Sequence, residues 1–173
     1  LSSGSPATAV QIGDPYTQKK LSDAITKEAR DLGLYSAITD NGAGGLSSSV
    51  GEMAEDSNGC SVDLEKVPLK YPGLTPWEIW ISESQERMTL AVPSATLDEF
   101  MDLMKRRGVD AWVIGEFTDS GSCVVNYNGE AILDIEMEFM HDGNPKYVLK
   151  TDWEKPEVVE PQMPESADAG KVF

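Results

Sequence analysis

The sequence predicts an α+β fold in which helices pack on a mixed sheet. Over the first two thirds of the chain, segments with helical spacing of apolar residues are interleaved with short strand-like segments. The later strand candidates are separated by brief turn signals, as is typical of antiparallel neighbours. With 173 residues, 40% of them hydrophobic, the chain can form one domain with a sizeable core.

The first predicted elements are a helix, a strand and a second helix. Asp14-Pro15 supplies an N-cap residue and a proline suited to the first helical turn. Apolar residues then recur at helical spacing as far as Gly33, which is expected to end this helix. A short strand is predicted over residues 34–39 and another helix over residues 46–55, ahead of a turn at Asn58-Gly59.

The middle of the chain is predicted to hold a strand and two capped helices. Apolar residues alternate at the start of residues 60–67, which indicates a strand. Residues 75–78 and 96–99 each place a glutamate three positions after a threonine, the pattern of a capping box. The second of these helices carries an apolar stripe typical of core packing and is expected to end at Gly108.

Further strands are predicted over residues 87–92 and 109–117. The turn signals at residues 119–121 and at Asn128-Gly129 are typical of hairpins and are expected to bound two more strands. The chain is therefore predicted to finish in an antiparallel meander.

Composition suggests one domain between two linkers. Residues 1–9 are interpreted as a linker, residues 10–147 as the domain, and residues 148–173 as an acidic, proline-containing linker or tail that cannot bury enough surface to fold alone. A linker at each end, and Leu1 in place of methionine, lead us to expect a fragment of a longer protein.

The charge balance excludes some classes of partner. Thirty acidic residues against 14 basic ones give a net charge of −16, which argues against binding to nucleic acids or anionic membranes. No apolar run approaches the roughly 20 residues of a membrane span, and no signal-peptide pattern opens the chain. Cys60 and Cys123 lack metal-type spacing. We expect a cytoplasmic protein with buried, reduced thiols.

A glycine-rich turn that leads into the helix predicted at residue 46 is a candidate anion site. Glycines can bring backbone N–H groups close to a ligand, and the start of the helix adds a field that favours phosphate. Asp40, just before the turn, is well placed to hold a divalent cation. The alternative is a loop that only caps the helix. The phosphate-loop candidates are Gly42, Gly44, Gly45, Ser47 and Ser48.

Two more polar clusters are candidate binding sites. Gln11 interrupts an apolar run before the first helix, where it could bind an amide or phosphate or satisfy loop backbone groups. Residues 82–87 pack carboxylates, hydroxyls, an amide and a guanidinium between apolar segments, so they face solvent or line a polar site. Glu86 and Arg87 are expected to point in opposite directions, one of them in an ion pair. His141 is interpreted as a surface or packing residue, because no nucleophile or metal motif accompanies it.

Several motifs, in order and spacing, resemble the synthetase subunit of phosphoribosylformylglycinamidine synthase. The resemblance covers roughly residues 8–147, and its most specific stretch is Ser-Glu-Ser-Gln-Glu-Arg-Met at residues 82–88. The other matching motifs are Val-Gln-Ile-Gly-Asp-Pro at 10–15, Asp-Asn-Gly-Ala-Gly-Gly-Leu at 40–46, Val-Pro-Leu at 67–69, Leu-Thr-Pro-Trp-Glu-Ile at 74–79, Val-Ile-Gly-Glu-Phe-Thr at 113–118 and Tyr-Asn-Gly at 127–129.

The resemblance implies an ATP-dependent carbon–nitrogen ligase of purine biosynthesis. With ATP and Mg²⁺, the full enzyme converts formylglycinamide ribonucleotide and glutamine into formylglycinamidine ribonucleotide, and a glutaminase supplies the ammonia. The superfamily is shared with aminoimidazole ribonucleotide synthetase, and this chain looks like the C-terminal-type domain of the enzyme's first half. The implied partners are the missing ATP-binding domain, the second homologous half and the glutaminase, fused or separate.

By the same resemblance, Gln11 matches a substrate-contacting glutamine and Asp40 a magnesium-binding aspartate, while Glu83, Ser84 and Gln85 match a substrate-binding triplet. The family's catalytic histidines and ATP-contacting lysine have no counterpart here, so no catalytic residue is assigned and the isolated chain is expected to be inactive. Asn41 replaces a methionine of many relatives.

Two other interpretations stay open on the sequence. The chain could be a non-catalytic interaction module of the same fold, or part of another ATP-dependent member of the superfamily, although the stretch at residues 82–88 argues against the latter. A homodimer formed through an apolar sheet edge is also left open.

Overall fold

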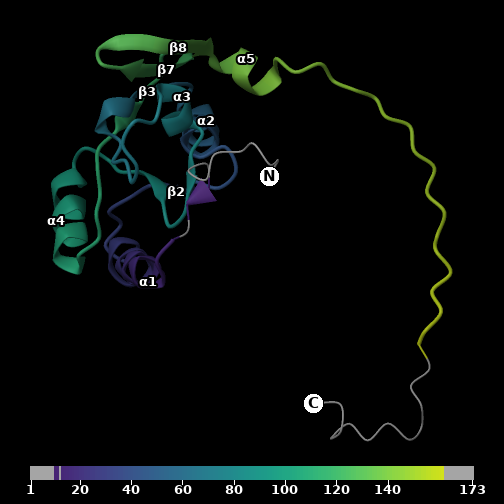
Figure 1. The fold of residues 1–173 in the computed structure, drawn as a ribbon, viewed down its shortest axis with the longest axis horizontal. Helices are drawn as coiled ribbons and strands as arrows, with labels where there is room; N and C mark the ends of the chain where they lie inside the picture. The colour runs from purple at the N-terminus through teal and green to yellow at the C-terminus, as the bar shows by residue number, and fades with distance from the viewer. Residues whose placement is uncertain (1–9, 12, 162–173) are drawn as a thin grey trace, which may run out of the picture.

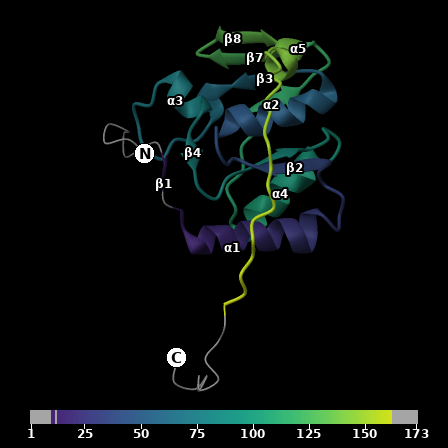
Figure 2. The ribbon, with the colours of Figure 1, turned by 90° about the vertical axis from the view of Figure 1, so that its right-hand side faces the viewer.

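The computed structural model describes residues 10–11 and 13–161, which form two groups of elements, each around its own core (Figure 1). The view in Figure 2 places these groups one above the other, with β3, β7, β8 and α2 in the upper half and β2, α4 and α1 in the lower half. A short parallel pair, β1 (Val10–Gln11) and β4 (Glu83–Ser84), lies along one side. The prediction of an α+β fold with helices packed on mixed sheet is confirmed.

The lower group packs two helices against a two-stranded antiparallel sheet. Its central residues are fully or almost fully buried: Ala24, Ala29, Leu34, Phe100, Leu103 and Met104. The elements are α1 (Pro15–Ala24), which continues as a π-helical segment (Ile25–Ala29), β2 (Ala37–Asp40), β5 (Met88–Ala91) and α4 (Leu97–Arg107).

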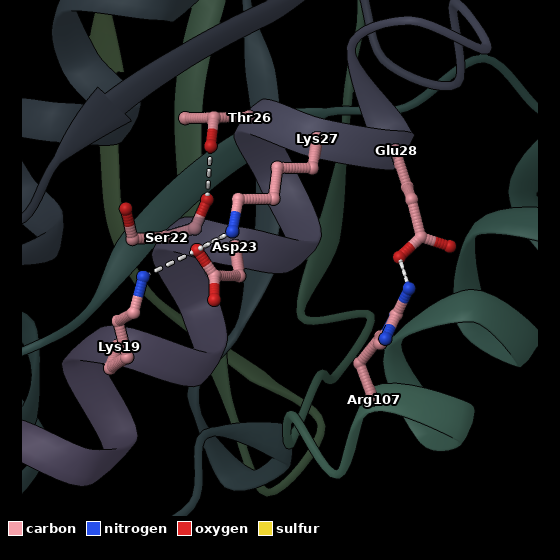
Figure 3. Close-up of polar contacts among 7 residues, drawn as sticks. All are labelled: Lys19, Ser22, Asp23, Thr26, Lys27, Glu28 and Arg107. Carbon is pink, nitrogen blue, oxygen red and sulfur yellow. Dashed lines mark hydrogen bonds and ion pairs between the residues drawn. The ribbon is translucent and has the colours of Figure 1, made fainter.

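Charged side chains stabilise the outer surface of this group (Figure 3). Asp23 accepts from Lys19 and Lys27, one turn to either side, at 2.8 and 2.9 Å. Hydrogen bonds from these two ammonium groups hold the pKa of Asp23 below its usual value. An ion pair between Arg107 and Glu28 joins α4 to the π-helical segment.

The upper group is built on a four-stranded mixed sheet of order β6-β3-β7-β8. One helix, α2, is packed with the sheet residues in a single core cluster that includes Leu46, Val50, Val62, Leu64, Ile79 and Val125. The elements are α2 (Leu46–Ser57), β3 (Cys60–Asp63), a 3-10 turn (Leu64–Lys66), α3 (Pro76–Trp80), β6 (Gly115–Phe117), β7 (Ser122–Tyr127), β8 (Glu130–Glu136) and α5 (Met137–Asp142).

The predicted terminal meander is wrong at its start. β3 lies between β6 and β7, antiparallel to the first and parallel to the second, so the turn at residues 119–121 crosses over β3 and is not a hairpin. The turn signal described only the local backbone, whereas the buried side chains of β3 fill the central position of the sheet. The hairpin between β7 and β8 is confirmed, with Asn128 and Gly129 both at positive φ (52° and 81°).

Two more predicted strands are shorter than expected. Only the first four of residues 60–67 form a strand, because the chain turns into a 3-10 helix at Leu64. Of residues 109–117, only the last three pair with β3, while Val109 and Ala111 pack against the lower core.

Helix ends follow the predicted signals with one exception. The capping box of α3 is formed, with Thr75 N donating to Glu78 Oε2 at 2.8 Å, and Gly108 ends α4 at a φ of 63°. The second capping box is not formed. Thr96 Oγ1 instead donates to the carbonyl of Leu34 at 3.1 Å, which connects the start of α4 to the segment between the first helix and β2.

The two cysteines, distant in sequence, are neighbours in the upper core. Cys60 and Cys123 are in register on β3 and β7, and both are free and buried, with their sulfur atoms 3.4 Å apart. The hydrogen bond shared with Cys60 and the burial raise the pKa of the Cys123 thiol. The expected burial of both thiols is confirmed.

The last helix and the segment after it differ in packing. α5 lies against α2, and its His141 Nδ1 is 3.9 Å from Glu55 Oε2. Residues 144–161 follow as an exposed segment without helix or strand, drawn in yellow-green to yellow in Figure 1. Across the described part of the chain, none of the helices has both the length and the apolar character needed to cross a bilayer.

Core truncation should destabilise the lower group strongly. Leu103 is 0% exposed, so Leu103→Ala is expected to lower the free energy of unfolding by about 2–5 kcal/mol through lost burial and a residual cavity. Leu32 is 57% exposed, and Leu32→Ala should change it by no more than about 0.5 kcal/mol. Urea unfolding of the two variants beside the parent chain measures both; equal effects would contradict this description of the core.

Candidate functional site

Two of the predicted polar clusters are neighbours in the fold. β1 runs parallel to β4, with Val10 in register with Glu83 and Gln11 with Ser84 (Figure 2). Only the backbone of Gln11 belongs to what the structure describes, so its side chain is outside the described atoms. The ladder brings together two segments more than 70 residues apart that the sequence marked separately.

The glycine-rich turn docks on the same strand. Gly44 N donates to Glu83 Oε1 at 3.3 Å. Gly45 is buried, with a φ of 57°, and a Cβ at this position would lie 2.1 Å from the carbonyl oxygen of Ser82. Glycine is therefore required here both for its backbone conformation and for the close approach of the two backbone segments. The turn and the backbone of β1 thus both contact β4.

The serines after the turn hold its shape. Ser47 Oγ donates to Gly44 O at 2.6 Å, and Ser48 Oγ donates to Ala43 O at 2.8 Å. Their hydroxyl protons are therefore engaged with the turn itself. α2 begins behind the turn without a side-chain cap, and Ser47 N already donates to Gly44 O at 3.1 Å, so the N–H groups of Leu46 and Ser48 are the donors that remain for an anion.

Asp40 lies at the end of β2, beside the turn. It pairs with Met88 of β5, is exposed, and has Oδ2 2.8 Å from the position that a Cβ of Gly42 would take. Gly42 thus leaves room for this carboxylate over the turn. The described residues contain no cluster of three or more histidine, cysteine or acidic side chains suited to a metal.

A buried polar network fixes the strand end that carries Asp40. Thr89 Oγ1 donates to Asn41 Oδ1 at 2.7 Å and lies 2.9 Å from Ser49 Oγ, while Asn41 N donates to Arg87 O at 3.1 Å. Asn41 and Ser49 are buried. The sequence did not indicate this network, because Asn41 was noted only as a departure from the family pattern.

Arg87 shapes the 82–88 segment from inside. Its Nε donates to Ser84 O at 3.1 Å and its Nη2 to Ser82 O, and burial lowers the pKa of the guanidinium. The ion pair expected for Glu86 or Arg87 is not found among the described residues, since Glu86 binds the backbone N–H of Asp14 at 3.2 Å. The sequence predicted neither role, because a side chain that bonds to backbone groups has no oppositely charged partner that could be recognised in the sequence.

The Glu83–Gln85 triplet is held in three different ways. Glu83 accepts from the glycine turn, and Ser84 Oγ lies 3.0 Å from Ser82 Oγ. Gln85 is exposed, and its Nε2 donates to Glu83 O at 3.2 Å. The fold thus collects carboxylate, hydroxyl, amide and backbone N–H groups on one surface. These groups suit a polar, phosphate-bearing ligand.

Comparison with known proteins agrees with the motifs. A model of the family "AIR synthase related protein, C-terminal domain" matches residues 1–128. The chain is similar to the phosphoribosylformylglycinamidine synthase subunit PurL of Methanopyrus kandleri, at 40% identity over 92% of this chain and 22% of that one. It is similar to the same subunit of Staphylococcus aureus at 43% identity over 86% of this chain and 20% of that one.

Solved structures give the same relationship. PurL of T. maritima complexed with FGAR superposes with a TM-score of 0.74 at 30% identity, over 87% of this chain and 25% of that one. The complex with ATP gives a TM-score of 0.75 at 28% identity, over 88% and 26%. The chain therefore spans between a fifth and about a quarter of the length of the relatives it matches.

The matched model covers most of the chain and the resemblance read from the motifs is confirmed. The chain belongs to the AIR synthase related protein, C-terminal domain family.

Proposed function

We propose that the chain is the substrate- and magnesium-binding domain of a phosphoribosylformylglycinamidine synthase. The complete enzyme would use ATP to amidate formylglycinamide ribonucleotide in purine biosynthesis. The observation that carries the proposal is the docking of the glycine turn on Glu83, next to Ser84, which is in register with Gln11 across the β1–β4 ladder. Relatives named for this activity, one of them solved with FGAR, support the choice of ligand.

Each group has a role that matches its chemistry. The backbone N–H groups at the start of α2 would bind the substrate phosphate, because they carry the positive end of the helix dipole. Glu83 would accept from ribose hydroxyls, and Ser84 would accept from or donate to them. The amides of Gln11 and Gln85 would recognise the formylglycinamide part, since an amide offers both donors and an acceptor.

Asp40 would hold Mg²⁺ with a single protein carboxylate. Magnesium keeps several waters and is usually bound by one or two carboxylates together with ligand phosphates, so an exposed Asp40 beside the turn fits it without a larger cluster. When bound, the ion would supply positive charge to neutralise phosphate oxygens. The chain's own contribution is to fix Asp40 at the end of β2 through the Asn41 network.

The remaining functions would come from other parts of the enzyme. An ATP-binding domain would carry the reactive residues, a second homologous half would complete the architecture, and a glutaminase would deliver ammonia. T. maritima PurL has been solved with ATP and with ADP, which supports ATP as co-substrate. A cytoplasmic location follows from this proposal and stays a prediction.

The chain alone should not catalyse the reaction. With formylglycinamide ribonucleotide, ATP, Mg²⁺ and ammonia supplied, ADP release should stay at the background of a protein-free control, because no catalytic residue is assigned to it. A complete synthase run in parallel is the positive control. Substantial turnover by the isolated chain would contradict the proposal that the reactive residues lie in other parts of the enzyme.

Removing a substrate-binding group should weaken substrate affinity. In the complete enzyme, Glu83→Ala or Gln85→Ala is expected to raise the KM for formylglycinamide ribonucleotide by roughly 10- to 100-fold, the effect of losing a hydrogen bond worth about 1.5–3 kcal/mol. Glu52→Ala, which removes an exposed carboxylate of α2, is the matched control and should leave KM unchanged. Unchanged KM in the first two variants would remove these residues from the site.

Asp40→Asn should shift the magnesium dependence. The variant keeps the shape of the side chain but loses its charge, so half-maximal activity should need more Mg²⁺, about tenfold for a loss near 1.4 kcal/mol. Asp56→Asn, an exposed site near the end of α2, is the control. An unchanged Mg²⁺ titration for Asp40→Asn would rule out Asp40 as a ligand.

A further inference from the structure

Glu86 makes a long-range contact that the proposed roles do not use. Its Oε2 accepts from the backbone N–H of Asp14 at 3.2 Å, across 72 residues of sequence. Its own backbone has a φ of 57°, in the left-handed region that non-glycine residues seldom adopt. The unfavourable backbone conformation of Glu86 and its long-range hydrogen bond together indicate a specific structural role for this residue.

The Glu86 carboxylate occupies the space beside Gly13 that a larger residue's side chain would take. A Cβ at Gly13 would lie 1.3 Å from Glu86 Oε2, 1.9 Å from Cδ and 2.1 Å from Oε1. The φ of Gly13 is outside the left-handed region, so an alanine could adopt the backbone conformation. Gly13 therefore leaves the space that the Glu86 carboxylate fills, and a larger residue would displace the end of the Glu86 side chain.

The Asp14–Glu86 contact lies next to the candidate substrate groups on both segments of the chain. Gly13 and Asp14 follow Gln11 by two and three residues, and Glu86 follows Gln85 directly. The β1–β4 ladder is only two residue pairs long, so it holds the two segments weakly on its own. The Glu86 contact adds a second attachment immediately beyond the ladder.

Arg87 and Asp14 make the attachment rigid at both ends. Arg87 donates to the carbonyls of Ser84 and Ser82, which fixes the course of the chain before Glu86. Asp14 is the N-cap of α1, and its carboxylate accepts from Thr17 N at 3.0 Å, so the N–H that binds Glu86 belongs to an anchored residue.

We propose that Glu86 is a positioning residue: its carboxylate, seated on Gly13 and bound to Asp14 N, holds Gln11 beside the Glu83–Gln85 triplet and so sets the affinity for formylglycinamide ribonucleotide. It acts through these neighbours and does not itself contact the ligand. The proposal rests on the function proposed above.

The test is a double-mutant cycle in the complete enzyme with Gly13→Ala, Glu86→Ala and the two combined. Each single change should raise the KM for formylglycinamide ribonucleotide about tenfold and leave the KM for ATP unchanged. The double variant should resemble Glu86→Ala alone, because the added methyl group then has space. Glu86→Gln keeps an acceptor for Asp14 N and should recover most of the affinity.

Gly51→Ala is the matched glycine control, since a Cβ there would meet only the Met140 side chain, at ordinary distances of 3.5 Å (Sδ) and 3.8 Å (Cε). Thermal unfolding of every variant separates a binding effect from loss of the fold and reports the coupling between positions 13 and 86 independently of substrate. Multiplicative effects on KM, near a hundredfold in the double variant, would overturn the proposal, and so would coupling seen in stability but not in KM.

The two proposals fail in different ways. If Glu83→Ala raises KM but the Gly13 and Glu86 variants do not, the positioning role is wrong and the substrate site stands. If Glu83→Ala and Gln85→Ala also leave KM unchanged, the substrate site itself is wrong, and the positioning role that depends on it is overturned with it.

Discussion

The close approach of Gly45 to the carbonyl of Ser82 is the constraint on which the candidate site depends. No side chain larger than hydrogen fits there, and the φ of 57° is one that glycine adopts at little cost. Because the two backbones touch, Gly44 N reaches Glu83 and the start of α2 faces the 82–85 segment. A turn that the sequence marked as a candidate anion site, or as a loop that only caps the helix, thereby gains a defined partner.

Both cores contribute to the placement of this contact. The glycine turn leaves β2 in the lower group and enters α2 in the upper group, while the 82–88 segment leads from α3 to β5 in the opposite sense. The polar surface thus lies where the two groups meet, and the Asn41–Thr89–Ser49 bonds join β2, β5 and α2 at this junction. Substitutions in either core are expected to alter the geometry of the site, because these elements connect the cores to it.

The sequence predicted the helix ends and turns that depend on residues close together in the chain. Asp14-Pro15, the Thr75–Glu78 box, Gly108 and Asn128-Gly129 each act within a few residues, and the structure has the helix or turn they indicate. Pairing between distant segments was not predictable in the same way. The insertion of β3 between β6 and β7 depends on burial of its side chains in a shared core, and Thr96 bonded a distant carbonyl in place of its own helix. For the site, residue types and a family resemblance indicated the groups, but not the Asp14–Glu86 and Arg87 contacts that arrange them.

The central claim is that the glycine turn and the 82–85 segment form a single wall of a nucleotide-substrate site. A crystal structure of the complete enzyme with formylglycinamide ribonucleotide tests it most directly. The account predicts ligand phosphate at the start of α2, with Glu83 and Gln85 in hydrogen-bond contact with the rest of the ligand. Density for the ligand at a surface that includes neither the turn nor these two residues would contradict it.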